Sequence, residues 1–452
     1  MRKSISSVGL GALALVAVFS ARARAQAATN GPTTIFWQQI GDSTLTRLIS
    51  EALHDGTSIR VAEARLDAAR ASRTLSAFDL APTVTASGSA FRTRQSMAQV
   101  PGLTSPLPQR DLYDVGFDAA WEIDLFGRVR RNVSAQGALA ASAEHSLEDV
   151  QVSLSAEVGR TYFELRGAQR QLAVALRNAD VQRKTVSLAQ DRLAAGRGTA
   201  FDVERARAVL DLTLAAVPAL QAQISATWFR IGTLLGRTQD ATPPQPLADV
   251  SLPDLPDSVA IGSAQQLVRN RPDVKAAERQ AAAQSFSVGA AQADYLPRVA
   301  LAASTGYTAN RIESLTRTGT SRVMVGPVVS FPLLDLGRVR QRVDLARAGK
   351  EEANAQYTAT VLHAVEETQS ASVTYARAHE RLALLEQAVK SSARASELSQ
   401  ERFEAGLTDF LQVLDAERTL LDAENQLTSA QTAAATALVA LYKAAGGTLS
   451  LR

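Results

Sequence analysis

The chain has 452 residues, 5% aromatic side chains and no cysteine. This composition excludes disulfides, thiolate metal sites and a lipidated N-terminal cysteine, and it argues against a large core of Phe and Trp. Of the 48 basic and 45 acidic residues, four basic and no acidic ones lie in residues 1–25; removing these four from 48 leaves 44 against 45. The basic excess belongs to this segment, so a nucleic-acid role loses its main support.

The N-terminus has the three parts of a secretory signal peptide. Arg2 and Lys3 form a basic start, residues 8–19 are apolar, and Ala23-Arg24-Ala25 is an A-x-A site. The apolar run is shorter than the ~20 residues of a membrane helix. We expect residues 1–25 to be removed, with cleavage after Ala25 or alternatively after Ala27. No later apolar stretch approaches the length of a membrane helix, so entry into a membrane would require a closed β-barrel.

A helix and a β-hairpin are predicted next. Apolar residues recur at helical spacing from Ser43 to about residue 81, and Pro82 ends the pattern. Residues 83–90 alternate in the manner of a strand, and residues 93–110 form a loop. The following strand alternates apolar side chains with acidic ones, which we expect to face a water-filled pore: Asp114, Asp118, Glu122 and Asp124. A strand of a soluble sandwich is the alternative.

Long helices follow the hairpin. No proline occurs from Gln109 to Val217, so residues 127–196 can form one helix of roughly 100 Å at ~1.5 Å per residue. Gly137, Gly159 and Gly167 are candidate bends or breaks in it. The returning helix covers residues 201–235, with a kink expected at Pro218.

The second half of the sequence repeats this order of predicted elements. Gly196 aligns with Gly406 at an offset of 210 residues, and the same offset superimposes the two Gly-Arg-Val-Arg sequences that begin at Gly127 and Gly337. The predicted organisation is a first repeat over 26–241 (helix, hairpin 83–125, helical hairpin 127–236), a Pro-rich linker over 242–257, and a second repeat over 258–452 (helix, hairpin 298–333, helical hairpin 337–444). The fold class is therefore mainly α with β, with an internal tandem repeat.

Architecture points to a conduit. Four strands cannot close a membrane barrel, because single-chain bacterial barrels begin at eight, so copies of the chain must share one. Long helices continuing from such a barrel would enclose a tunnel. We predict a channel through the outer membrane that extends into the periplasm, with the two glycine turns at its far end. A soluble periplasmic coiled-coil adaptor is the alternative from a different class; the helices would permit it, but the strand hairpins would not.

Motifs across nearly the whole mature chain resemble the outer-membrane efflux protein family, the TolC-like channels, in the branch typified by OprM and NodT that serves tripartite multidrug pumps. They are Trp121–Arg128, Gln266–Val268 with Arg271–Val274, Gly326-Pro327 with Phe331–Leu333 and Gly337-Arg338, and Leu414–Arg418. The resemblance implies a homotrimer with a shared twelve-stranded transmembrane β-barrel, four strands per protomer, continuous with an α-helical barrel. Many members of this branch have a lipidated N-terminal cysteine, which is absent here, so lipid anchoring is not expected.

The resemblance also implies a gate at the periplasmic tip, opened when a periplasmic adaptor and an inner-membrane RND transporter dock. Asp415 matches the tip acidic residue and Leu411 the apolar constriction, while Asp409 lies nearer the turn. Leu411 and Asp415 are i and i+4, so they share a helix face. Arg205 occupies the position equivalent to Asp415 in the first repeat, and we expect the two to hold the tip closed. Without the resemblance, Asp415 would be read as a solvated residue or a partner of Arg418.

The turns are candidates for adaptor docking through Gly196, Gly198, Gly406 and Leu407. Each glycine is also a candidate C-cap, and both interpretations can hold together.

Nothing in the sequence indicates an enzyme, a cofactor or a metal site. The four histidines are dispersed, and His363 with Glu366 and Glu367 does not form the H-E-x-x-H zinc pattern. Gly196-Arg197-Gly198 is not followed by a phosphate-binding lysine. The expected partners are further copies of the chain, outer-membrane lipid, an adaptor and a transporter, with no nucleic acid. An exit duct for type I protein secretion competes with efflux of small molecules.

Overall fold

The computed structural model describes residues 32–94, 96, 105, 108–238, 256 and 268–449. Over these residues the chain is mostly helical with a small sheet, as the sequence predicts. The predicted signal peptide with its two candidate cleavage sites, most of the predicted 242–257 linker and most of the predicted 93–110 loop lie outside the described residues.

The chain divides into two compact units, and each takes residues from both halves of the sequence. The first comprises Met1–Glu63, Ser146–Val274 and Thr360–Arg452, and the second comprises Ala64–His145 and Lys275–Ala359.

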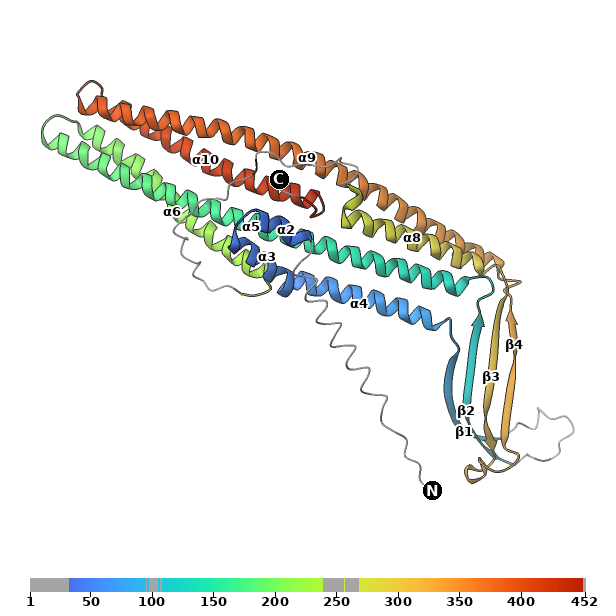
Figure 1. The fold of residues 1–452 in the computed structure, drawn as a ribbon. Coiled ribbons are helices and arrows are strands. Elements are labelled where there is room, and N and C mark those ends of the chain that lie inside the picture. Colours follow the sequence, from blue (N-terminus) through green and yellow to red (C-terminus); the bar gives the residue numbers. More distant parts are fainter. Residues whose placement is uncertain are drawn as a thin grey trace. The chain divides into compact units, whose positions relative to one another are not determined.

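The second unit contains a four-stranded antiparallel sheet in the order β1-β2-β3-β4 (Figure 1). The strands are β1 Thr83–Thr93, β2 Arg110–Ile123, β3 Arg298–Ala309 and β4 Ser321–Ser330. A 3-10 turn, η2 Ile312–Ser314, lies between the last two. The register aligns Thr85, Asp118, Ser304 and Met324 across the sheet. Odd-numbered positions of β2 and β3 therefore share one largely apolar face, and even-numbered positions share a more polar one.

Pro327 shows why a proline is tolerated in this sheet. It pairs with Leu301 of β3, but β4 is an edge strand within the chain. Thr308 donates to Thr320, so Leu301 and Pro327 form a pair without hydrogen bonds, and the missing N–H removes no bond of the β3–β4 ladder.

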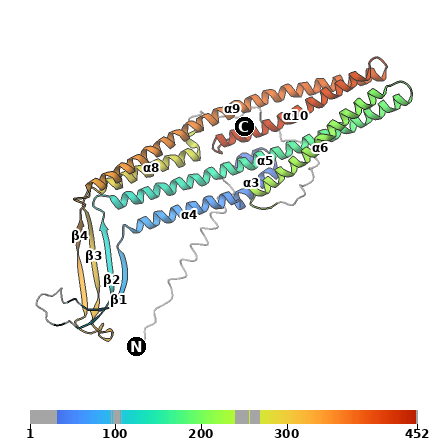
Figure 2. The same cartoon turned by 180° about the vertical axis from the view of Figure 1, so that it is seen from behind.

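Two helical hairpins are seen side by side in both views (Figures 1 and 2). One pairs α5 Arg128–Ala194 with α6 Ala200–Leu234, and the other pairs α9 Leu336–Glu404 with α10 Phe410–Ala444. The shorter helices are α2 Pro32–Gln39, α3 Ser43–Asp55, α4 Thr57–Phe78 and α8 Pro272–Ala293. The predicted helix from Ser43 is thus two helices that meet at Gly56, and Pro218 lies inside an unbroken α6.

The glycines of α5 do not break the helix. A β-carbon at Gly159 would lie 2.4 Å from the Trp37 ring, and one at Gly167 would lie 2.2 Å from the Thr432 hydroxyl oxygen. Both distances are shorter than any real contact, so these glycines allow close packing of Trp37 and Thr432 against α5.

The main core of the first unit is built mostly from α2, α3, α5, α6 and α10, with Ile59 from α4 and Tyr375 from α9. Its centre holds Phe36, Trp37 and Tyr442, whose rings lie 4.4–4.9 Å apart. Asp42 caps α3 by accepting from the backbone N–H of Thr44 at 2.8 Å, and its other oxygen accepts the Tyr162 hydroxyl at 2.6 Å. The cap therefore also ties α3 to α5.

Among the described helices, α6 contains one stretch that is long and apolar enough to cross a membrane by length and composition alone. No apolar stretch of this length was expected after residue 25, so that expectation is wrong. A single helix of this kind is weak evidence for a membrane span, because core helices of soluble proteins meet the same criterion.

Candidate functional site

The two turns that join the helices of each hairpin have the same geometry. Gly196 donates to the Leu193 carbonyl at 3.0 Å, and Arg197 donates to the Arg192 carbonyl at 2.9 Å. The equivalent bonds from Gly406 to Phe403 and from Leu407 to Arg402 measure 3.0 and 2.8 Å. This is the Schellman ending of a helix, and it needs a left-handed residue. The two glycines supply it, with φ of +70° and +72°.

The helices that leave the turns are capped by side chains. Thr199 accepts from the Asp202 N–H, and Asp202 accepts from the Thr199 N–H at 3.0 Å, which forms a capping box on α6. Asp409 caps α10 by accepting from the Gln412 N–H at 3.0 Å. The Asp409 carboxylate, predicted as part of the gate, therefore has a local structural bond as well.

The turns enclose a cavity of about 360 Å³ within the first unit. Its floor is the apolar cluster in which the Phe403 and Phe410 rings lie 5.5 Å apart, with the Arg192 guanidinium 4.1 Å from the Phe403 ring centre. Predicted gate and docking residues from both hairpins contribute to its lining: Gly198, Arg205, Asp409 and Leu411. The fold thus brings these four together, although they come from both halves of the sequence.

Leu411 and Asp415 share the exposed face of α10. Leu411 is 44% exposed and Asp415 is exposed, whereas Val413 and Leu414 between them are buried. Arg205 is exposed on α6, and among the described residues of a single chain no ion pair joins it to Asp415. Leu407, at the second turn, is 70% exposed.

Glu417 is a polar residue of this region that the sequence analysis did not single out. The Thr185 hydroxyl of α5 donates to its carboxylate at 3.1 Å, and burial raises the pKa of Glu417 above its usual range. A helical-spacing argument could have identified it, because Glu417 lies four residues after the buried Val413 and three after the buried Leu414.

The four strand acids lie in different environments. Arg322 binds Asp114 through two bonds of 2.7 and 2.9 Å. Arg128 binds Glu122 at 2.6 and 3.0 Å. Asp124 lies beyond the end of β2, where it accepts from the N–H groups of Val129 and Arg130 and so caps α5. Asp118 accepts the Ser87 hydroxyl at 2.8 Å. The alternation in the sequence groups these acids, but it does not show which of them have a cationic partner.

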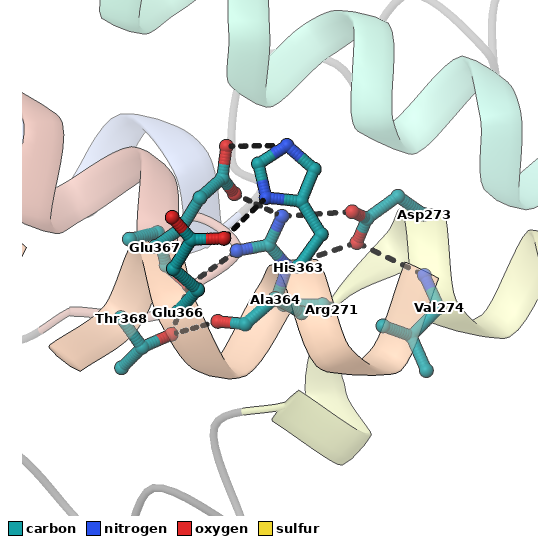
Figure 3. A network of polar contacts seen from close by, with 9 residues as sticks. Arg271, Asp273, Val274, His363, Ala364, Glu366, Glu367 and Thr368 are labelled. Carbon is teal, nitrogen blue, oxygen red and sulfur yellow. Dashed lines mark hydrogen bonds and ion pairs between the residues drawn. The ribbon is translucent and has the colours of Figure 1, made fainter. Parts of the chain in front are cut away.

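The Arg271–Val274 motif builds a buried ion-pair network (Figure 3). Arg271 is 7% exposed and binds Asp273 at 2.8 Å, Glu367 at 2.6 Å and the Ala444 carbonyl at 3.1 Å. Burial, reinforced by nearby Asp273, raises the pKa of Asp149. The network joins the start of α8 to α9 and the end of α10, so its role here is to hold the helices together.

His363 borders this network on α9. Its ring lies 3.8 Å from Glu367 and 4.0 Å from Glu366 on one exposed face of α9 (Figure 3). In the part of the chain that the structure describes, no group of three or more metal-binding side chains is present.

Comparison with known proteins gives consistent matches over about nine-tenths of the chain. The family described as "Outer membrane efflux protein" matches residues 48–237 and 263–447. Outer membrane protein OprJ of Pseudomonas aeruginosa is 30% identical, over 92% of this chain and 86% of its own length. Toluene efflux pump outer membrane protein TtgI of Pseudomonas putida is 28% identical over 90% and 86%. The solved structure of the outer-membrane channel OprN has 39% identity and a TM-score of 0.85, covering 92% of each chain.

Proposed function

This chain belongs to the outer membrane efflux protein family, and from that membership we propose that three copies form a passive conduit from the periplasm to the exterior of a Gram-negative cell. Each protomer would contribute four strands to a twelve-stranded transmembrane β-barrel and two helical hairpins to an α-helical barrel. The soluble adaptor considered from the sequence is set aside, because the family is one of outer-membrane proteins.

The proposed assembly rests mainly on the exposed apolar face and the unpaired edges of the sheet. Its apolar face is open to solvent in the single chain, with Phe117 58%, Val323 75% and Val325 66% exposed. Both outer strands, β1 and β4, lack a partner on one side within the described sheet. Unpaired backbone groups and an exposed apolar face are costly in isolation, but both are satisfied in a closed barrel surrounded by lipid.

The apolar surface of α6 supports the same assembly. Leu212 is 75% exposed and Phe229 is 43% exposed on this helix. A helix of a ring buries such side chains against its neighbours. Helices of adjacent protomers would therefore cover a surface that the single chain leaves open.

Internal duplication accounts for the order of the elements. The series α4, β1, β2, α5, α6 is followed by α8, β3, β4, α9, α10. We therefore assign residues 26–241 and 258–452 to two structural repeats, joined by the linker 242–257 and preceded by the signal peptide 1–25.

The tip of the helical hairpins is the proposed gate. Leu411 and Asp415 would face the axis of the trimer, and three Asp415 side chains would form an acidic ring. Arg205 would bind Asp415 of a neighbouring helix in the closed state, with Asp409 capping the helix behind it. The exposed turns at Gly196, Gly198, Gly406 and Leu407 would meet a periplasmic adaptor that works with an inner-membrane RND transporter.

Small toxic compounds are the proposed cargo. One relative is named for the efflux of toluene, and toluene is a small apolar molecule. The chain itself would supply the passage, with the transporter supplying the energy. The acidic side chains that line the pore of the barrel would be those in or next to β2: Asp114, Asp118, Glu122 and Asp124.

Conductance in planar lipid bilayers tests the proposed channel. The purified mature protein should insert from detergent and give discrete single-channel steps. A strain that lacks the gene should become more susceptible to organic solvents and cationic dyes, and the wild-type gene should restore resistance. A protein that washes off the outer membrane without detergent, or that never conducts, would contradict the proposal.

The gate makes a separate prediction. Asp415→Ala or Arg205→Ala should raise the frequency of the large-conductance state several-fold, because either change removes one side of the proposed contact. Arg207→Ala is the matched control, since Arg207 lies on the same helix but binds Glu204 at 2.9 Å within it. Channels of both gate variants that stay as closed as wild type would rule out the contact.

A further inference from the structure

The polar face of the sheet carries three carboxylates, from Asp114, Asp118 and Glu122, with Asp124 just beyond its end. Most of this negative charge is neutralised inside the chain. Glu122 is held by Arg128, and Asp124 is used as a helix cap and lies 3.2 Å from Arg130. The four acids formed a single group in the sequence, but their contacts differ.

Asp114 accepts three side-chain hydrogen bonds. Arg322 donates from two nitrogens to its two oxygens, and the Thr308 hydroxyl donates to it at 2.6 Å. Bidentate pairs of this kind are the strongest arrangement of an arginine and a carboxylate. The negative charge of Asp114 is therefore neutralised by Arg322.

Two glycines explain how Arg322 reaches across the sheet. Arg322 pairs with Gly306, and Gly306 pairs with Gly116. A β-carbon on Gly116 would lie 3.2 Å from the Arg322 Nη2 atom, so the guanidinium passes over a strip without side chains. From there it binds Asp114 on one side and the Ser304 hydroxyl on the other.

Asp118 is left with a hydroxyl as its partner. It accepts from Ser87 at 2.8 Å, and among the described residues it makes no ion pair. The other charged positions of the face lie elsewhere: Arg298 binds Asp294 at 2.6 Å, and Arg110 lies at the far end of β2. At the level of Asp114, Asp118 and Arg322, each chain keeps a net charge of −1.

We infer that Asp118 sets the charge preference of the passage through the sheet, where three copies form a ring of −3 that favours cations and disfavours anionic compounds. The inference rests on the proposed trimer with the polar face lining the pore. Charged side chains that ring a pore select among ions by concentrating those of opposite sign. Asp118 does so because, among the described residues, its carboxylate forms no ion pair and the nearby Arg322 guanidinium is bound to Asp114.

Reversal potentials in a KCl gradient test this inference. Asp118→Asn should lower the ratio of potassium to chloride permeability roughly two- to fivefold in 0.1 M salt, with a larger effect at lower salt. The measurement is made in the Asp415→Asn background, so that the proposed acidic ring of the tip does not mask the ring in the sheet.

The matched control removes one positive and one negative charge together, so the net charge of the chain does not change. Arg92→Gln combined with Asp111→Asn deletes a whole ion pair from the same sheet, where the Arg92 Nε atom lies 2.6 Å from Asp111, so the net charge of −1 at the level of Asp118 remains and the permeability ratio should stay unchanged. Far-UV circular dichroism and the size of the detergent complex verify that both variants fold and assemble.

The outcomes separate this inference from the proposed function. If Asp118→Asn keeps the parent ratio, or if the control shifts the ratio equally, the role of Asp118 is wrong although the channel stands. If the unsubstituted protein never conducts, the channel itself fails, and this inference fails with it.

Discussion

At the scale of single residues, Glu417 shows how the fold changes the chemistry of a side chain. Its carboxyl group lies between α10 and α5, where burial raises its pKa, and its bond from Thr185 opposes that rise only in part. A raised pKa means that the folded state binds the proton more tightly than the unfolded state does. The contact is therefore most stable at acidic pH, and stability is lost as the pH rises through the folded pKa.

Glu417→Gln should remove this pH dependence. The amide keeps an oxygen for the Thr185 hydroxyl but cannot ionise, so the α5–α10 contact should gain up to about 1 kcal/mol at neutral pH and little at acidic pH. Hydrogen exchange of residues 410–424 measures it, after correction for the intrinsic effect of pH on exchange. Asp422→Asn is the control, since Asp422 is exposed one turn further along α10. Equal pH dependence in wild type and Glu417→Gln would contradict this assignment.

Arg271 illustrates what a motif alone does not say. The sequence indicated the Arg-Pro-Asp-Val motif only as a sign of resemblance, whereas the structure makes its arginine a buried bridge between Asp273 and Glu367. Glu367 is 94 residues beyond Asp273, so no local pattern predicts the pair. Removing one partner of such a pair typically costs 3–5 kcal/mol, because the other is left buried and uncompensated.

At the scale of elements, the sequence predicted what depends on local physics. Alternation located the strands, and the glycines with their 210-residue offset located both helix turns. Gly159 and Gly167 were predicted as bends or breaks, but α5 runs through both without a break, and the contacts that they allow are with Trp37 and Thr432 from distant helices. Asp118 and Asp114 look alike along the strand, and only the strand register shows that Arg322 reaches Asp114. Contacts between segments that are distant in the chain could therefore not be predicted from the sequence.

At the scale of the whole molecule, the open edges of the sheet require an explanation. Strand β1 presents one free edge and β4 the other, and they differ in sequence. An interface between two different edges is head-to-tail, so repeating it either closes a ring or continues without end. A ring of three closes twelve strands, the number that the family resemblance implies.

Engineered disulfides can show whether β4 of one protomer lies beside β1 of the next. The chain has no cysteine, so every crosslink comes from the introduced pair. We expect Ala86→Cys on β1, combined in turn with Val323→Cys, Val325→Cys or Val329→Cys on β4, to give a reducible covalent trimer in at least one combination. Several positions are needed because the register between protomers is open, and a disulfide requires Cβ atoms about 3.5–4.5 Å apart.

The internal strands provide the control for that experiment. Ala119 of β2 pairs with Ala303 of β3 within one chain, so Ala119→Cys with Ala303→Cys should form a disulfide that leaves the denatured protein at monomer mass. If this control oxidises while every β1–β4 pair stays monomeric or stops at a dimer, three-fold closure of the sheet is wrong. A covalent trimer that forms only in the β1–β4 combinations would support the closure. It would show that β1 of one protomer lies beside β4 of the next, since no other described strand has an open side.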